Sequence, residues 1–383
     1  MKKIYFIGNN LNLKKDKGGL GAGEQVLLRH FIRFREEGVK VIIINTGRFK
    51  NDFGFEEINI PKKWWHPPLR KLTPWLTQLR INMMYRALRK EIQSNEPAAV
   101  LSLFGEYSNL LAYKISKKKG LNLYMIFHDD SVFNYFKKYR LLSDHQLHCI
   151  IKTTTCFFPV SKPMALLLEK YGAGAGELLY PIPESGSFGA KKFEDVNFTE
   201  LQIGNSGLIF DDLHLEIIEN IVKAAKTVNA HLQLITNLPE KLSAHIYSFG
   251  NNVKVIERFD TVTELLNYLS LSIDVLLVFY SFKPDKEFRM FTSFPSKFVE
   301  YCKLGLPVII IAPPESSIGK WAVENKWLTY ENTGEPANIA ATIAKLNNRD
   351  FWNNCQLQAQ KYADTDFNPD EIHRKLSNSI KYK

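Results

Sequence analysis

The sequence predicts an α/β protein with two domains in tandem, each built on a parallel sheet. Apolar, β-branched runs alternate with helical patterns in the first half of the chain, and the same alternation restarts at Leu201. The stretch between them, Pro181–Phe198, is rich in proline, glycine, serine and charge and has no apolar periodicity. Alternating strands and helices form parallel sheets through right-handed crossovers, and 383 residues suit two domains.

The elements of the first half follow from short apolar runs and helical spacing. A helix is expected over Glu24–Arg35, where apolar residues recur at helical spacing and Gly38 provides the stop, and another over Leu110–Lys118. The apolar runs predict strands at Ile4–Ile7, Val39–Ile44, Ala98–Phe104, Leu121–Phe127 and Phe157–Val160.

The second half repeats this rhythm. Gly305 and Pro307 lie where one helix should end and the next strand begin. Strands are expected at Leu201–Gly204, His231–Thr236, Val253–Ile256, Asp274–Val278 and Val308–Ile311, and helices at Leu215–Thr227, Thr263–Ser270, Lys297–Leu304 and Pro369–Ile380. We therefore expect a first domain over 1–183, a linker over 184–200, a second domain over 201–362, and a C-terminal helix within 363–383 that could pack back on the first domain.

Composition narrows the class of protein. Hydrophobic residues make up 45% and charged residues 23%, which excludes a disordered or collagen-like chain. The apolar runs are far shorter than the roughly 18 residues that cross a membrane, and the first run is too short for a signal peptide, so a cytoplasmic protein is expected. The four cysteines form no Cys-x-x-Cys pair and no metal-ligand spacing, which indicates free thiols.

Positive charge is concentrated in the first half. Residues 1–200 contain 31 Lys and Arg against 19 Asp and Glu, a net charge of +12, whereas the remainder holds 19 against 21, a net charge of −2. Between 61 and 91, eight Lys and Arg accompany one acidic residue, and Trp64 and Trp65 lie among them. Tryptophans with cations favour an anionic membrane surface, at the inner face for a cytoplasmic protein. The alternative is a helix packed on its own domain with a solvated basic face; no nucleic-acid motif accompanies the segment.

The segment Ser293–Tyr301 has the residues of a nucleotide-binding helix. Pro295 suits the helix entry, and the unpaired backbone N–H groups of a helix N-terminus suit a diphosphate. Lys297 would add positive charge, and the Glu300 carboxylate, one turn in, could accept hydrogen bonds from two neighbouring hydroxyls, as on a ribose. A capped amphipathic helix with an exposed glutamate is the alternative for these nine residues alone.

Two further motifs lie in the first half. Gly18–Gly23 has glycine at four of six positions, which permits close approach of backbone to a ligand, although a flexible surface loop is the alternative. It is neither a P-loop nor the dinucleotide spacing. His128 and Asp129 follow the strand Leu121–Phe127, at the end where ligands bind in such sheets. The imidazole could hydrogen-bond a sugar hydroxyl or hold a proton, and a helix N-cap by Asp129 is the alternative.

The Ser-x-Pro-Ser-Lys-x-x-Glu-Tyr motif at Ser293–Tyr301, followed by Cys302–Ile309, resembles nucleotide-sugar glycosyltransferases of the GT-B fold, in particular the retaining group 1, or family 4-like, enzymes. Gly18–Gly23, Phe158–Gly172 and Ile203–Gly207 resemble further segments of that family. The resemblance implies two Rossmann-like domains facing across a cleft. It also implies transfer of a sugar from a nucleoside diphosphate to an acceptor hydroxyl, such as one on a cell-surface polysaccharide or a lipid-linked glycan, without a metal or a bound cofactor.

The resemblance also implies roles for individual residues. Glu300 would bind the ribose, Ser296 and Lys297 would meet the diphosphate, and His128 and Asp129 would act on the transferred sugar as the catalytic pair. The full set expected to bind the donor is Gly19, Gly21, Asn205, Ser206, Arg258, Lys283, Arg289, Ser293, Pro295, Ser296, Lys297 and Glu300.

The sequence departs from the family at two places. The retaining enzymes carry a second acidic residue eight positions before the ribose glutamate, where this chain has Thr292. They also place cations just after the turn that follows Gly204, whereas this chain has none there, although Lys283, Lys286 and Arg289 could substitute. These departures leave open a GT-B sugar-nucleotide epimerase or hydrolase, and a scaffold that kept the fold without catalysis.

Overall fold

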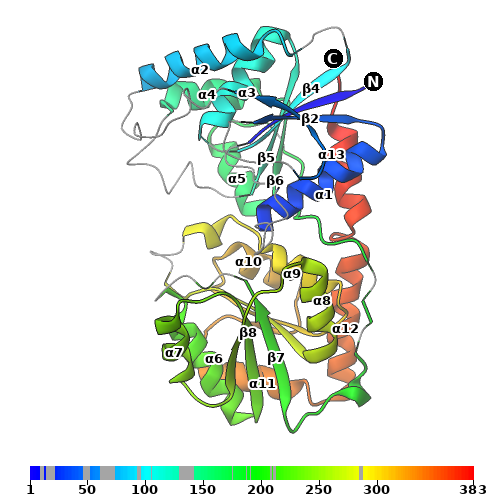
Figure 1. Cartoon of the computed structure of the whole chain (residues 1–383). Helices are drawn as coiled ribbons and strands as arrows, with labels where there is room; N and C mark the ends of the chain where they lie inside the picture. The colour runs from blue at the N-terminus through cyan, green and yellow to red at the C-terminus, as the bar shows by residue number, and fades with distance from the viewer. Residues whose placement is uncertain are drawn as a thin grey trace. The chain divides into compact units, whose positions relative to one another are not determined.

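The structure is a computed structural model. It describes residues 1–8, 13, 22–45, 52–60, 74–92, 96–104, 106–128, 142–174, 176–186, 188–189, 191–207, 209, 213–283 and 288–383. The chain forms two compact units (Figure 1). The first comprises the described residues before Pro181 together with Ile372–Lys383, and the second is Pro181–Glu371.

The first unit is built on a sheet of six parallel strands in the order β3-β2-β1-β4-β5-β6. The strands are β1 (Lys3–Ile7), β2 (Lys40–Asn45), β3 (Glu56–Asn59), β4 (Ala98–Leu103), β5 (Asn122–Phe127) and β6 (Cys156–Pro159). β1 lies between β2 and β4, and all five of its residues are buried. A strand covered on both faces needs apolar side chains at successive positions, which explains its continuous apolar run.

Helices cover both faces of this sheet. Tyr5 and Ile7 share a buried cluster with side chains of α2 (Pro74–Leu88), α3 (Glu106–Lys119), α4 (Asp144–Thr153) and α5 (Lys162–Lys170). Phe6 points to the opposite face, where its ring packs edge-on against Phe31 of α1 (Ala22–Glu36) with 4.7 Å between the ring centroids. Successive side chains of β1 point to opposite faces of the sheet, so the strand contributes to the hydrophobic core on both faces.

The C-terminal segment completes the first unit. Helix α13 (Pro369–Ser379) places His373 against α1, where its Nδ1 lies 3.0 Å from Nδ1 of His30 and its Nε2 lies 3.2 Å from a carboxylate oxygen of Glu37. Burial lowers the pKa of both histidines, whereas the Glu37 carboxylate acts in the opposite direction on the pKa of His373. Beyond α13, the backbone groups of Lys383 and Ala98 exchange hydrogen bonds of 2.8 and 3.1 Å.

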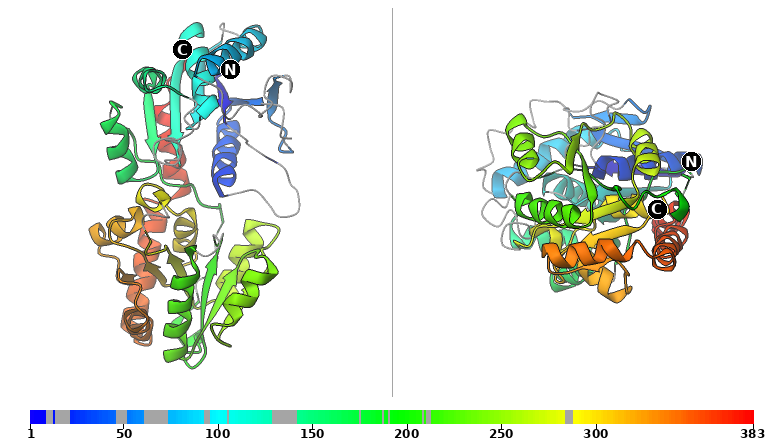
Figure 2. Two further views of the ribbon diagram at one scale, coloured as in Figure 1. Left: turned by 90° about the vertical axis from the view of Figure 1, so that its left-hand side faces the viewer. Right: turned by 90° about the horizontal axis from the view of Figure 1, so that it is seen from below.

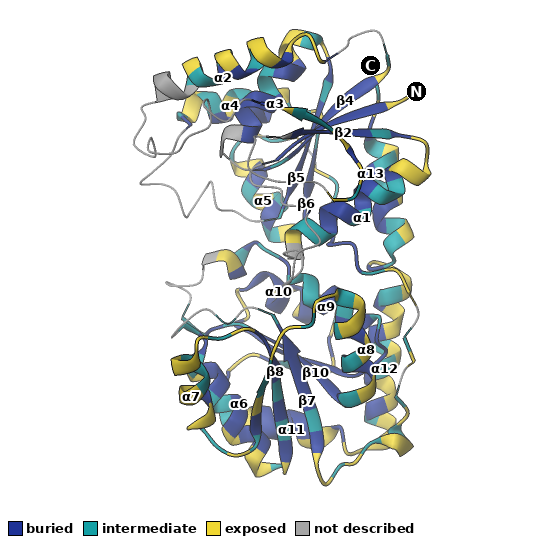
Figure 3. Ribbon diagram, in the orientation of Figure 1, coloured by how far each residue is buried: buried dark blue, intermediate teal, exposed yellow. Residues whose placement is uncertain are grey.

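The second unit has the same architecture, with six parallel strands in the order β12-β11-β10-β7-β8-β9. The strands are β7 (Leu201–Ser206), β8 (Ala230–Ile235), β9 (Val253–Ile256), β10 (Val275–Phe279), β11 (Val308–Ile311) and β12 (Tyr330–Glu331). The helices are α6 (Leu215–Thr227), α7 (Glu240–Tyr247), α8 (Val262–Ser272), α9 (Ser296–Cys302), α10 (Ser317–Glu324), α11 (Pro336–Lys345) and α12 (Arg349–Asp364). β10 and β11 are buried at every position, whereas α6, α7 and α11 carry exposed residues (Figure 3). Figure 2 shows the elements of each unit in two further views.

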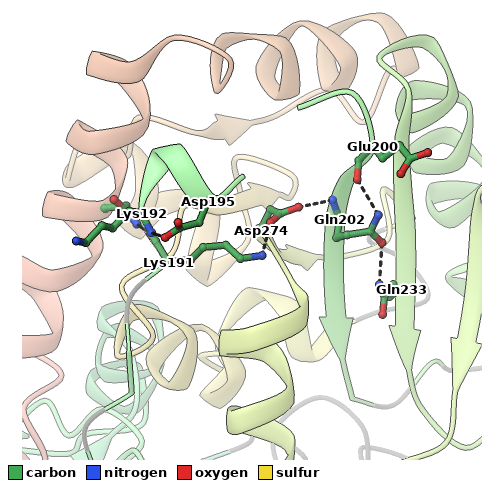
Figure 4. Close-up of polar contacts among 8 residues, drawn as sticks. Lys191, Lys192, Asp195, Glu200, Gln202, Gln233 and Asp274 are labelled. Carbon is green, nitrogen blue, oxygen red and sulfur yellow. Dashed lines mark hydrogen bonds and ion pairs between the residues drawn. The ribbon is translucent and has the colours of Figure 1, made fainter. Parts of the chain in front are cut away.

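Residues expected to form a linker are anchored on the second sheet (Figure 4). Nζ of Lys191 lies 2.5 Å from Oδ1 of Asp274, and the backbone N–H of Gln202 donates to Oδ2 of the same carboxylate at 2.8 Å. Asp274 is 3% exposed and directly precedes β10, so this ion pair lies at the amino ends of the strands. Any ligand site at the carboxyl ends is therefore at the opposite edge of the sheet from this anchor.

Candidate functional site

Lys297 lies where β7 and β10 end in the second unit. Its Nζ is 5.8 Å from the centroid of the Phe279 ring, at the end of β10. The same atom lies 3.2 Å from the position that a Cβ on Gly207, directly after β7, would occupy. Gly207 has φ of +125°, which side chains disfavour. The Lys297 ammonium thus lies next to a residue without a side chain. Both are at the carboxyl ends of the strands, where ligands bind in such folds.

Glu300 follows Lys297 by three residues and lies on the same side of α9. Phe298, Val299, Tyr301 and Cys302 are buried, which leaves Ser296, Lys297 and Glu300 on the half-exposed side of the helix. Phe298 fixes the buried side because its ring packs edge-on against Trp321 and Trp327, with centroids 5.0 and 5.1 Å away. The helix therefore presents a cation and a carboxylate about one turn apart.

The carboxylate of Glu300 is held by the segment that follows the first unit. Its Oε2 accepts a hydrogen bond of 2.9 Å from the backbone N–H of Glu184. The backbone carbonyl of Glu184 in turn accepts a hydrogen bond of 2.6 Å from Nζ of Lys303. Neither Glu184 nor Lys303 is among the residues that the sequence singled out. The spacing of Glu300 and Lys303, one turn apart, carries a weak signal for the lysine, and no sequence pattern points to a backbone N–H.

Asn205 and Ser206 lie inside the second unit. Asn205 is 2% exposed, and its side-chain amide donates to the carbonyl of Leu277 at 2.6 Å. The backbone N–H of Ser206 donates to the Tyr301 hydroxyl at 2.7 Å, and the two hydroxyls lie 2.9 Å apart. Burial raises the pKa of Tyr301 to about 12, so its hydroxyl stays protonated. The two side chains join β7 to β10 and α9, and their expected contact with a donor stays a prediction.

The other residues of the second unit that are expected to bind the sugar-nucleotide donor follow strand ends or precede α9 in the sequence. Arg258 is exposed after β9, and its backbone N–H donates to the side-chain carbonyl of Asn237 at 3.0 Å. Lys283, after β10, forms an ion pair of 2.5 Å with Glu216 in the first turn of α6. Arg289 is exposed in the 3-10 helix Phe288–Phe291, and Lys286 is outside the described residues.

The residues at the N-terminus of α9 are Thr292, Ser293, Pro295 and Ser296. Pro295 is the N-cap residue, and no side chain among the described residues caps this end of the helix. Ser296 is the first helical residue, and the Ser293 carbonyl accepts a hydrogen bond from the Ser317 hydroxyl of α10. Thr292, at the position where the family that the sequence resembles has an acidic residue, is buried at 7% exposure. Its hydroxyl cannot supply the charge of a carboxylate.

The first unit brings His128 next to the beginning of α1. His128 follows β5 and is half-buried, and its Nδ1 lies 3.7 Å from the position that a Cβ on Gly23 would occupy. Expected site residues Asp129, Gly19 and Gly21 are outside the described residues, as are positions 61–73. Within the described ranges, no group of three or more His, Cys, Asp or Glu side chains is placed to hold a metal ion.

Comparison with known proteins finds similar folds among solved structures. No protein-family model matches the chain, and no curated protein matches it. Among solved structures, HepE from Anabaena in complex with UDP is 12% identical with a TM-score of 0.66, and the match covers 99% of each chain. A TarM variant from S. aureus, in complex with fondaparinux, alpha-GlcNAc-glycerol and UDP, is 10% identical with a TM-score of 0.68 over 99% of each chain.

A third similar structure is a Listeria monocytogenes protein provisionally named a UDP-N-acetylglucosamine 2-epimerase. It is 11% identical with a TM-score of 0.59, and the match covers 98% of this chain and 95% of that one. Proteins with different names thus share one architecture with this chain, and identities this low establish architecture alone. With its two six-stranded parallel α/β units, the chain has the GT-B fold.

Proposed function

We propose that the protein is a glycosyltransferase that moves a sugar from a nucleoside-diphosphate sugar to an acceptor hydroxyl. The observation that carries the proposal is the pairing of Lys297 and Glu300 on the half-exposed side of α9, with the Lys297 ammonium next to Gly207 where β7 ends. A cation beside a residue without a side chain suits a diphosphate, and a carboxylate one turn away suits ribose hydroxyls. The TarM and HepE structures that share this fold contain UDP, which supports a uridine nucleotide as the first donor to test.

The proposed roles follow from the chemistry of transfer. The acceptor oxygen bonds to the anomeric carbon and gives up its proton, while the bond between that carbon and the diphosphate breaks. Negative charge therefore develops on the leaving nucleoside diphosphate. Lys297 and the Ser296 hydroxyl would stabilise that charge, while Glu300 would hold the ribose. Arg258, Lys283, Arg289, Ser293 and Pro295 stay proposed donor contacts. In the first unit, we propose that His128 and Asp129 act on the transferred sugar, with Gly19 and Gly21 contributing backbone contacts.

Binding of a nucleoside diphosphate is the first test. UDP, UDP-glucose, UDP-N-acetylglucosamine, GDP and ADP should be screened by thermal shift, because a ligand that binds only the folded protein raises its melting temperature. We expect at least one diphosphate to raise the melting temperature and the matching nucleoside to leave it unchanged. A chain that none of the five stabilises would instead fit a scaffold without catalysis.

Product analysis then separates transfer from epimerisation, which the likeness to the Listeria protein keeps as a second candidate. A transferase releases nucleoside diphosphate in proportion to added acceptor. An epimerase converts the sugar nucleotide without an acceptor, and a hydrolase releases free sugar. Detection of an epimerised sugar nucleotide in the absence of acceptor would replace the proposed reaction.

The exposed surface of α2 supports a membrane-bound acceptor such as a lipid-linked glycan. Leu79 and Met83, one turn apart, are 41% and 45% exposed. Burial is the largest cause that lowers the pKa of Lys114, and the positive charges of Lys118 and Arg86 lower it further. Apolar side chains among cations fit the surface of an anionic bilayer. None of the described helices has the length and apolar character that crossing a bilayer requires.

Vesicle binding tests this surface. The protein should sediment with vesicles of phosphatidylcholine and phosphatidylglycerol and much less with phosphatidylcholine alone, because each cation near an anionic surface contributes about 1 kcal/mol. The double variant Arg86→Gln/Lys118→Gln should lose roughly tenfold or more of this binding, and Leu79→Asp/Met83→Asp should lose most of it. Leu357→Asp, which alters a leucine of α12 that is 67% exposed, is the matched control. Equal sedimentation of all variants would exclude this face.

A further inference from the structure

We propose that Lys303 and the backbone of Glu184 are positioning groups that hold the Glu300 carboxylate in the orientation that selects ribose over deoxyribose. This inference rests on the proposed function, because it assumes a nucleotide donor at Glu300. It adds to that function two groups, an ammonium and a backbone N–H, that touch no reacting atom and act through the carboxylate.

The contacts form one chain of hydrogen bonds. Lys303 Nζ donates to the Glu184 carbonyl at 2.6 Å, and the Glu184 N–H donates to Glu300 Oε2 at 2.9 Å. Glu300 and Lys303 lie about one turn apart on the chain. The backbone N–H and the carbonyl of Glu184 are therefore both bonded by the same short segment. Both bonds include a charged partner, which makes them stronger than neutral hydrogen bonds.

The segment that carries Glu184 is suited to hold a fixed position. It reads Pro181-Ile182-Pro183-Glu184, and the three residues before Glu184 are buried. Proline fixes its own φ and restricts the residue before it, so this stretch loses little freedom when it is ordered. The Glu184 N–H is therefore a rigid donor, in contrast to a side-chain donor that could turn away.

The proposed complex places the Glu184 N–H and two ribose hydroxyls on one carboxylate. An ionised carboxylate has about four lone-pair positions on its two oxygens, and the Glu184 N–H takes one of them. Two adjacent ribose hydroxyls can therefore bond to the same group. Because the orientation is fixed before the nucleotide arrives, the hydroxyls need not order a mobile side chain. A nucleotide that lacks one hydroxyl would leave a half-buried carboxylate under-satisfied, and discrimination follows from that loss.

The test compares each nucleoside diphosphate that binds with its 2′-deoxy counterpart, by calorimetry on the full chain. The wild type should prefer the ribonucleotide by about tenfold or more. Lys303→Met keeps the aliphatic stem and removes the ammonium, and it should reduce this preference about three- to tenfold while weakening deoxynucleotide binding little. Lys345→Met, at an exposed lysine of α11, should keep the full preference. A merely structural role for Lys303 would lower affinity for both nucleotides equally and leave their ratio unchanged.

A second pair of variants tests the N–H itself. Glu184→Ala and Glu184→Pro both remove the side chain, and only proline removes the donor. The ratio of ribonucleotide to deoxynucleotide affinity should be higher in the alanine variant than in the proline variant, whether or not Lys303→Met folds. Failure of the wild type to bind any of UDP, GDP and ADP would overturn the proposed function and this inference with it. A wild type that binds but shows no preference, or variants that keep it in full, would overturn the inference alone.

Discussion

Replacing Glu300 by glutamine should lower the affinity for a ribonucleoside diphosphate by about 10- to 100-fold, because hydrogen bonds to a charged acceptor contribute about 1.5–3 kcal/mol. The amide keeps the size of the side chain, and one of its two terminal groups becomes a donor that faces the Glu184 N–H or a ribose hydroxyl. The change therefore removes acceptor capacity and leaves the packing of α9 in place. Calorimetry with the diphosphate found in the thermal-shift screen measures the loss.

The specificity of this result depends on its controls. Glu335→Gln changes an exposed glutamate at the N-cap of α11 and should bind the nucleotide as the wild type does. Affinity for the 2′-deoxynucleotide should fall less than affinity for the ribonucleotide, since the carboxylate acts on hydroxyls. If Glu300→Gln binds both nucleotides with wild-type affinity, the ribose role of this residue is excluded and the proposed function loses its main support.

The sequence predicted the interior of both sheets because interior strands are covered on two faces. β1 and β10 are buried at every position, so all of β10 and Ile4–Ile7 of β1 form uninterrupted apolar runs. The edge strands β3 and β12 were not expected. Among the described residues, β3 reads Glu-Glu-Ile-Asn and pairs only with β2, and β12 has two residues and pairs only with β11. An edge strand of this kind takes its position from its neighbour, and its own side chains carry little apolar pattern.

Local spacing also predicted that Lys297 and Glu300 share one side of α9. Lys297 and Glu300 are three residues apart on a helix, so they must share a side wherever the helix packs. The surroundings of Glu300 could not be predicted, because Glu184 is 116 positions away in the sequence. Asn205 shows the same limit. A polar side chain at a strand end can face a ligand or the core, and its partner carbonyl on Leu277 lies 72 positions further along the chain.

Removing the ammonium of Lys297 should have the largest effect on turnover. Lys297→Met should lower kcat/KM with the sugar nucleotide by about 10²-fold, because a cation at the leaving diphosphate stabilises the charge that develops in the transition state. Met keeps the stem of the side chain along Phe279, so α9 should stay folded. Steady-state assays of nucleotide release measure the effect, and Lys320→Met, at an exposed lysine of α10, is the matched control.

Gly207→Ala changes the other partner of the contact between Gly207 and Lys297. It shows whether the position of the ammonium affects diphosphate binding. A Cβ there would lie 3.2 Å from Lys297 Nζ, and the φ of +125° adds strain of about 1–3 kcal/mol. Gly38→Ala carries a positive φ of +74°, and no described residue lies within 4 Å of its Cβ, so it reports strain without a steric effect. Both variants should lose stability, and only Gly207→Ala should also weaken diphosphate binding. Equal nucleotide affinity in the two glycine variants, with Lys297→Met as active as the wild type, would exclude this edge of the sheet as the diphosphate site.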